Sequence, residues 1–203
     1  MDVYLQNILG YDALEIGLAF LPVAVLIGAL SLGFSARLMM RYGARTTLVP
    51  SLVLILAGLL LFTQAPVDGT YVADVLPVMV LLGLGAGLAF PAMATLAMSG
   101  ATASDSGLAS GLVNTSMQIG GAIGLAVLAT LATSRTDSLL DGGASSAVAL
   151  TGGYHLAFGV AAGLVAAAIV IAVTVLEPAA VTAGEEEAER AAPALEPAYS
   201  EAA

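Results

Sequence analysis

The sequence predicts an all-α, polytopic helical membrane protein, and its hydropathy pattern carries this prediction. Hydrophobic residues make up 59% of the 203-residue chain and charged residues only 10%, whereas soluble domains contain about 25% charged residues. A hydrocarbon core about 30 Å thick is crossed by ~20 helical residues. Longer stretches than this lack Asp, Glu, Lys and Arg at 16–36, 46–67, 75–104, 106–134 and 142–176. None alternates apolar and polar residues as barrel strands do, so we expect helices.

Turn and cap signals divide the chain into elements. Asp12 and Glu15 have the spacing of a capping box, which predicts the start of the first helix. We expect the spans at about 13–35, 46–65, 74–98, 107–133 and 154–176. Residues 13–177 would then form one five-span domain. Residues 1–12 are expected to be the remnant of a preceding helix and an outer loop, and residues 178–203 an acidic disordered tail.

Composition excludes several classes of function. The net charge is −10, but seven of the fifteen acidic residues lie beyond the last span, so we expect no nucleic-acid partner. The chain contains no Cys, which excludes a disulfide framework and a thiolate metal site. We expect no metal and no cofactor. The apolar spans make the lipid bilayer the main partner and argue against an enzyme.

The arginines predict the orientation in the membrane. Arg37, Arg41 and Arg45 crowd the short connection between the first two spans, together with Gly43, whereas among the later connections only 134–153 holds a basic residue. The positive-inside rule therefore places the arginine connection in the cytoplasm. Counting spans from there puts the acidic tail in the cytoplasm. We interpret the cluster as topogenic first and as a gating element second.

The fourth predicted span is the most polar. Steps of three or four residues put Gly111, Asn114, Gln118 and Gly121 on one helical face, and amide side chains do not face lipid without a large free-energy penalty. One interpretation is that Asn114 and Gln118 hydrogen-bond to a neighbouring helix. The other is that they line a water-filled path.

Other residues suggest close helix packing or an apolar binding surface. Pro22, Pro77 and Pro91 are expected to bend helices that line a cavity. Phe90, Met79 and Met93 would offer an adaptable surface to a drug-like ligand, or pack or face lipid. Glycines spaced four apart allow close helix approach, and such pairs occur at Gly83/Gly87, Gly107/Gly111, Gly120/Gly124 and Gly159/Gly163.

Titratable residues are absent from the span interiors. Glu15 and Asp74 lie only at helix ends, and His155, the single histidine, is expected to be an interfacial polar cap with a minor proton-linked role as the alternative. Proton-coupled carriers need a titratable group within the membrane. If this protein exchanges protons for substrate, the proton carrier is expected outside this polypeptide.

Short motifs in a fixed order resemble a known family. They are Tyr4-Leu5-Gln6, Leu9-Gly10-Tyr11, Gly17-Leu-Ala-Phe-Leu-Pro22, Gly83-Leu-Gly-Ala-Gly-Leu-Ala-Phe-Pro91, Gly107-Leu-Ala-Ser-Gly-Leu-Val-Asn-Thr115 and Gln118-Ile-Gly-Gly121. Together residues 3–177 resemble the C-terminal part of a major facilitator superfamily transporter, in the fourteen-span drug:proton antiporter branch of QacA type. The chain would be an incomplete C-terminal six-helix half. Met40 and Met117 depart from the family pattern, where an acidic residue and an Arg are expected.

The resemblance implies a proton-coupled multidrug efflux permease of the cell membrane that works by alternating access. Its partners would be small amphipathic or cationic drug-like substrates, protons and the missing N-terminal half, without which the chain is expected not to transport. Asn114 and Gln118 would face the cavity. Two alternatives stay open: a five-span structural or assembly subunit, and an intramembrane serine hydrolase that uses Ser110 and His155. The hydrolase is disfavoured because these two residues lie at opposite ends of their spans.

Overall fold

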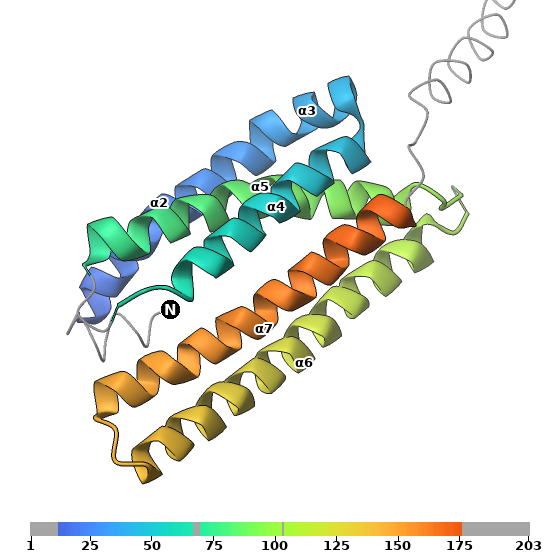
Figure 1. The fold of residues 1–203 in the computed structure, drawn as a ribbon. Coiled ribbons are helices and arrows are strands. Elements are labelled where there is room, and N and C mark those ends of the chain that lie inside the picture. Colours follow the sequence, from blue (N-terminus) through green and yellow to red (C-terminus); the bar gives the residue numbers. More distant parts are fainter. Residues whose placement is uncertain (1–11, 67–69, 103, 176–203) are drawn as a thin grey trace, which may run out of the picture.

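The computed structural model describes residues 12–66, 70–102 and 104–175, and in this part of the chain the secondary structure is helical without strands (Figure 1). Helical runs long and apolar enough to cross a bilayer are Gly17–Tyr42, Ala44–Phe62, Tyr71–Met98, Ser106–Asp141 and Ser146–Thr174. The prediction of an all-α protein with five membrane-spanning helices is confirmed. Residues 1–11 of the predicted helix remnant (1–12) and the acidic tail (178–203) lie outside the described residues.

The first span is a continuous helical run with a change of pitch inside it. It consists of α2 (Ala13–Ala29), a π-helical turn (Leu30–Phe34) and α3 (Ser35–Tyr42). The predicted capping box is confirmed, because Glu15 N donates to Asp12 Oδ1 over 2.8 Å and Asp12 N donates to Glu15 Oε2 over 3.0 Å. At the π turn the Ser35 amide donates to the Leu30 carbonyl, five residues back.

The arginine connection is helical, although its polar composition predicted a break between the first two spans. α3 carries Arg37 and Arg41, and α4 (Ala44–Phe62) carries Arg45 in its first turn. Only Gly43 separates the two helices, with φ of +83°. Glycine adopts this left-handed conformation without the steric penalty of a side chain, so a single residue reverses the chain direction.

The last two helices are also longer than the hydropathy pattern predicted. α6 (Ser106–Asp141) and α7 (Ser146–Thr174) take up most of the expected loop at 134–153. Thr136 Oγ1 donates to the Ala132 carbonyl over 2.9 Å and lies 3.3 Å from the Ala149 carbonyl, so it links the two helices. The polar residues that end the predicted apolar spans thus lie within α6 and α7, which pack against each other here.

The third span begins with a second π-helical turn (Tyr71–Val75) that leads into α5 (Leu76–Met98). Pro77, which has no amide donor, is the second residue of α5, and α5 directly follows the π-helical turn. Pro91 and, in α2, Pro22 lie within their helices.

The helices pack in the spatial order α2, α5, α4, α7, α6, so α5 and α4 lie inside and α2 and α6 at the two edges (Figure 1). Two apolar clusters hold this arrangement together. The first contains Ala19, Phe62, Ala65, Val75, Val78 and Met79. The second contains Leu48, Leu52, Ala89, Ala92 and Ala172. α6 packs mainly on α7 and makes only slight contact with α5.

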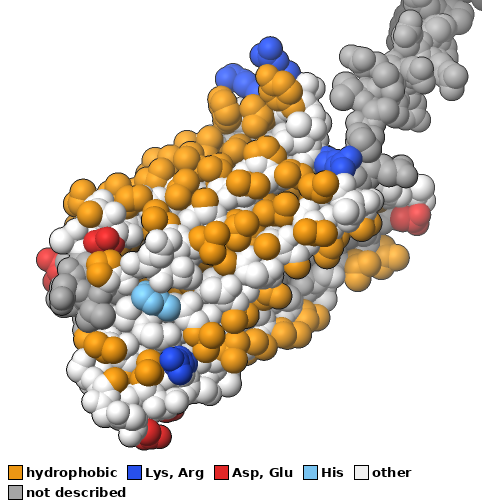
Figure 2. All heavy atoms as spheres, in the orientation of Figure 1, with side chains coloured by type: hydrophobic (Ala, Val, Ile, Leu, Met, Phe, Trp, Pro, Cys, Tyr) orange, Lys and Arg blue, Asp and Glu red, His pale blue; other side chains and the backbone are white. Residues whose placement is uncertain are grey.

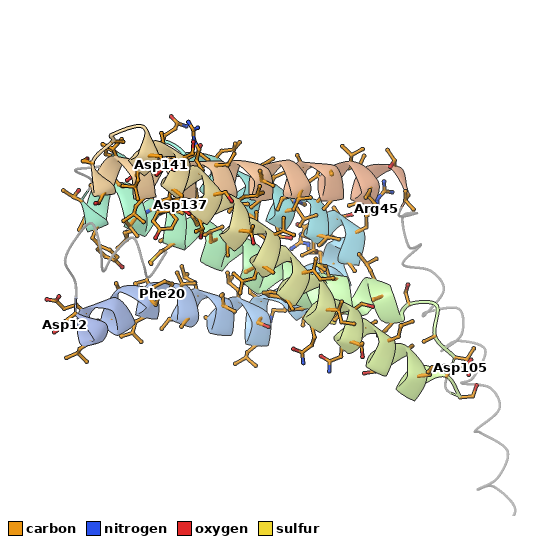
Figure 3. The ribbon with its side chains drawn as sticks, turned by 90° about the horizontal axis from the view of Figure 1, so that it is seen from below. Asp12, Phe20, Arg45, Asp105, Asp137 and Asp141 are labelled. Carbon is orange, nitrogen blue, oxygen red and sulfur yellow. The ribbon has the colours of Figure 1, made fainter. Side chains whose placement is uncertain are left out.

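Charged side chains gather at the two ends of the elongated bundle, with an apolar band between them (Figure 2). Asp12, Asp137 and Asp141 lie at one end and Arg45 and Asp105 at the other (Figure 3). This separation is the arrangement that a helical bundle needs to cross a hydrocarbon layer.

Candidate functional site

A groove runs between α5 and α6, where these two helices diverge. Its cavity has a volume of about 330 Å³. Its lining residues are Met93, Ala94, Ala97, Leu112, Val113, Ser116 and Met117. Apart from the Ser116 hydroxyl, all of these side chains are apolar. The groove can therefore hold a small apolar or amphipathic molecule, and two flexible methionine side chains can adapt to its shape.

The three apolar residues singled out in the sequence occupy different environments. Met93 is 42% exposed and lines the groove. Phe90 lies one turn away on α5 and is 52% exposed, but it is not among the lining residues. Met79 is fully buried in the first apolar cluster. Met93 alone of the three thus lies where a ligand in this groove would touch it.

Asn114 and Gln118 are exposed on α6, and neither side chain makes a hydrogen bond to another described residue. A helix turns about 100° per residue. On that basis these amides lie roughly 150° around α6 from the middle of the groove-lining positions. The structure therefore does not bring them together with Met93, and they face away from the groove.

The predicted glycine pairs fall into two groups. A Cβ at Gly83 would lie 3.2 Å from Leu26 Cβ, and one at Gly87 would lie 3.0 Å from Leu30 Cβ, so both glycines pack against the first span. The remaining pairs have no other atom within 4 Å of such a Cβ: Gly107/Gly111, Gly120/Gly124 and Gly159/Gly163.

A second hollow lies at the opposite end of the bundle from Arg45. It has a volume of about 440 Å³ and is lined by Glu15, Leu18, Ala19, Pro22, Tyr71 and Leu76. Glu15 accepts the Asp12 amide as part of the capping box, and Asp74 Oδ2 accepts the Thr70 amide over 2.7 Å. Both carboxylates thus cap helix ends, as their positions in the sequence suggest.

The three arginines of the connection differ in their contacts. Arg37 and Arg41 are exposed on α3, with Arg41 5.4 Å from the centre of the Tyr42 ring. Arg45 instead reaches the end of α7, where Nη2 donates to the Val173 carbonyl over 2.6 Å and Nε to the Ala172 carbonyl over 3.3 Å. No sequence signal distinguishes Arg45 from its neighbours, because its partners lie more than 120 residues away.

His155 and Ser110 lie far apart in the α6–α7 hairpin. His155 Nε2 lies 3.0 Å from the Ala65 carbonyl, in the part of α7 that is near the end of α4. Ser110 is exposed in the second turn of α6, toward the other end of the α6–α7 hairpin. The structure therefore does not place them as a nucleophile and its base, which need hydrogen-bond distance.

Similarity to known proteins agrees with this architecture. The family model described as Major Facilitator Superfamily matches residues 1–125. The chain belongs to the Major Facilitator Superfamily. The match covers more than half of the chain, and with the apolar spans it makes this a multi-pass membrane protein.

Named relatives of this chain include resistance and export proteins. The puromycin resistance protein pur8 of Streptomyces alboniger is 37% identical over 179 residues, which are 85% of this chain and 35% of that protein. The cephamycin export protein CmcT of Amycolatopsis lactamdurans is 35% identical over 67% of this chain and 28% of its own length. The tetracenomycin C resistance and export protein of Streptomyces glaucescens is 33% identical over 65% of this chain and 24% of its own length.

The chain spans about a third of the length of pur8 and less of the other two relatives. None of these names denotes an enzyme. The relatives therefore do not indicate chemistry at a nucleophile.

Proposed function

We propose that this chain is the C-terminal part of a proton-coupled multidrug efflux permease of the fourteen-span QacA type. The observation that carries the proposal is the apolar groove between α5 and α6, in a chain whose relatives are named for antibiotic resistance and export. Substrates would be small amphipathic or cationic drug-like molecules. The groove volume of about 330 Å³ lies at the lower end of the 300–1,000 Å³ that is typical of ligand sites.

Transport by alternating access would require the N-terminal half of the permease. In secondary transporters the substrate site lies between repeats that rock against each other. Asn114 and Gln118 face away from the α5–α6 groove and are exposed. Their exposure supports a role in lining the path shared with the missing half, where their amides would meet polar groups or water. The titratable group that carries protons would lie in that half.

The ends of the bundle support an orientation. Arg37, Arg41 and Arg45 cluster where α3 meets α4, whereas Arg135, near the end of α6, is the single Arg or Lys in α6 and α7. Positive charge favours the cytoplasmic side. We therefore place the α3–α4 turn and the acidic tail in the cytoplasm of a cell whose plasma membrane holds the permease.

Reconstitution into liposomes tests this proposal. The chain alone and the chain joined to the missing half are compared for uptake of a cationic dye driven by a pH gradient. We expect uptake only with the joined protein, and we expect Met93→Asp to abolish it, because a charge would enter the apolar groove. Leu140→Asp, at a site with the same 42% exposure near the end of α6 and outside the groove, is the matched control. Dye movement by the chain alone would refute the need for the missing half.

Copurification separates the proposed function from the alternative of an assembly subunit. A stoichiometric partner in mild detergent, with no transport by the joined protein, would favour a subunit that docks through its open α6 face. Membership of a transporter superfamily favours the permease instead.

A further inference from the structure

At one end of the interface between α4 and α7, the guanidinium of Arg45 hydrogen-bonds across the two helices. The two helices run antiparallel, so the first turn of α4 lies beside the last turn of α7 (Figure 3). Arg45, in that first turn, donates from Nη2 and Nε to the carbonyls of Val173 and Ala172. Carbonyls in the last turn of a helix have no amide partner within the helix. The guanidinium satisfies two of them and lies at the negative end of the helix dipole.

The opposite end of the same interface is fastened by His155. Its Nε2 lies 3.0 Å from the Ala65 carbonyl, three residues beyond the end of α4. Because a carbonyl only accepts, this nitrogen carries the proton and donates it. The neighbouring rings of Phe62 and Phe158 meet edge to face with centroids 4.6 Å apart. A side chain of α7 thus binds the chain just past the C-terminus of α4, as a side chain of α4 binds the C-terminus of α7.

We propose that Arg45 and His155 form a two-ended clasp that holds the α6–α7 hairpin on the rest of the bundle, with each end able to release separately. α6 packs mainly on α7 and makes only slight contact with α5, so the position of α6 depends on how α7 is held against α4. Ala172, near the Arg45 end, and Ala65, at the His155 end, belong to separate apolar clusters. The two ends are therefore separate contacts along one helix pair.

The clasp gives the proposed permease a means of moving α6. Release of the Arg45 end while the His155 end holds would swing the nearby end of the hairpin away from α4 and widen the α5–α6 groove there. Release of the His155 end while the Arg45 end holds would instead swing the opposite end of the hairpin away from α4. This consequence rests on the proposed function, whereas the clasp itself does not.

The arginine cluster supplies a matched control. Arg37→Gln removes the same charge from the same end of the bundle as Arg45→Gln, but the Arg37 side chain is exposed on α3 and makes no hydrogen bond to another described residue. A purely topogenic role would make the two substitutions equivalent. Arg45→Lys keeps the charge, but its single ammonium lacks the fork of donors that reaches two carbonyls.

Thiol labelling measures the two ends separately. The chain has no Cys, so a single introduced cysteine is the only reactive thiol. Ala172→Cys reports on the Arg45 end and Ala65→Cys on the His155 end, at sites 3% and 4% exposed. Each reporter is combined with Arg45→Gln, Arg45→Lys, Arg37→Gln or His155→Phe in the full chain. Labelling by a small water-soluble methanethiosulfonate is followed in mild detergent, without substrate.

Arg45→Gln is expected to accelerate labelling at Ala172→Cys about tenfold or more, as expected for loss of a charge-assisted hydrogen bond. Labelling at Ala65→Cys should stay within about twofold. His155→Phe should do the opposite, Arg45→Lys should be intermediate and Arg37→Gln should change neither rate.

Equal effects of Arg45→Gln and Arg37→Gln would overturn the clasp. Faster labelling at both reporters after either single substitution would also overturn the clasp, because the two ends would then not be separate. If Arg45→Gln fails to fold, Arg45→Lys provides the same test. Because the labelling is measured without substrate, a different labelling pattern would refute the clasp alone. Absence of dye uptake by the joined protein would refute the proposed function alone.

Discussion

α5 and α6 are both apolar, glycine-rich helices, but they occupy opposite environments in the bundle. α5 packs against α2 through Gly83 and Gly87 and against α4 through Gly85. None of the described residues of α6 is buried, and its glycines have no neighbouring atom within 4 Å where a Cβ would stand. The same small-residue spacing thus accompanies a tightly packed helix in one case and an open one in the other.

Glycine spacing therefore permits close packing of a helix but does not specify it. A helix at the centre of the bundle meets a partner on two sides, whereas α6 lies at an edge and meets mainly α7. The exposed fractions of the residues in α5 and α6 therefore follow from the positions of these helices in the bundle. Substitutions at glycines of the two helices should therefore differ in their effect on stability.

The largest effect is expected at Gly85. A Cβ there would lie 2.8 Å from the Ser51 carbonyl oxygen and 3.0 Å from the Ile55 backbone nitrogen. Backbone atoms of α4 cannot move aside alone, so Gly85→Val should lower the free energy of unfolding by about 3 kcal/mol or more. Thermal unfolding in mild detergent, followed by circular dichroism, measures this. Gly111→Val on α6 is the control, and an equal loss there would contradict the comparison.

A smaller loss is expected at the contact between α5 and the first span. A Cβ at Gly87 would lie 3.0 Å from Leu30 Cβ and 3.1 Å from Ile27 Cα. These contacts are tight but can relax by a few tenths of an ångström, so Gly87→Ala should destabilise by about 1 to 2 kcal/mol. Gly124→Ala, with open space around it, should leave the unfolding temperature unchanged or raise it through its better helix propensity.

Removal of one hydroxyl tests the polar part of the same contact. Tyr71 donates from its hydroxyl to the Ala19 carbonyl over 2.7 Å and so links the third span to α2. Tyr71→Phe should lower the free energy of unfolding by about 1 kcal/mol, the value of a typical hydrogen bond. Tyr42→Phe at a half-exposed site on α3 is the control. Chemical unfolding at constant detergent concentration compares them, and a larger loss at Tyr42 would count against the assignment.

The smallest effect is expected on the exposed face of α6. The side chains of Asn114 and Gln118 make no hydrogen bond to another described residue, so Asn114→Ala and Gln118→Ala should change the stability of this chain by less than about 0.5 kcal/mol. The same unfolding assay measures the change. A loss above about 1 kcal/mol would mean that this face is buried in detergent, which would remove the contrast with α5.

Local sequence signals predicted those features that depend on neighbouring residues. The capping box was predictable because Asp12 and Glu15 satisfy each other's backbone amides within one turn. The span positions followed from hydropathy. The helical connection at Arg37 and Arg41 could not be predicted from polarity, because charged residues end an apolar span without ending the helix, and only Gly43, at φ of +83°, interrupts it.

The candidate site was predictable only in part. Met93 was singled out for its flexible side chain and lies in the groove, but the partners that complete the groove come from α6. The contacts of Arg45 and His155 join residues 90 to 128 positions apart. Nothing in the local pattern around either residue specifies such a partner.

The sequence by itself determined that this chain is a set of apolar helices with charged ends, since the bilayer leaves an isolated backbone segment no other way to satisfy its amides. The tertiary structure decided which helices lie inside and which at the edges. It also decided which glycines are packed, and which of three neighbouring arginines binds the end of a distant helix. These choices depend on how surfaces far apart in the chain fit together, because lipid solvates apolar helices as well as a neighbouring helix does and only close packing and directed hydrogen bonds distinguish one partner from another.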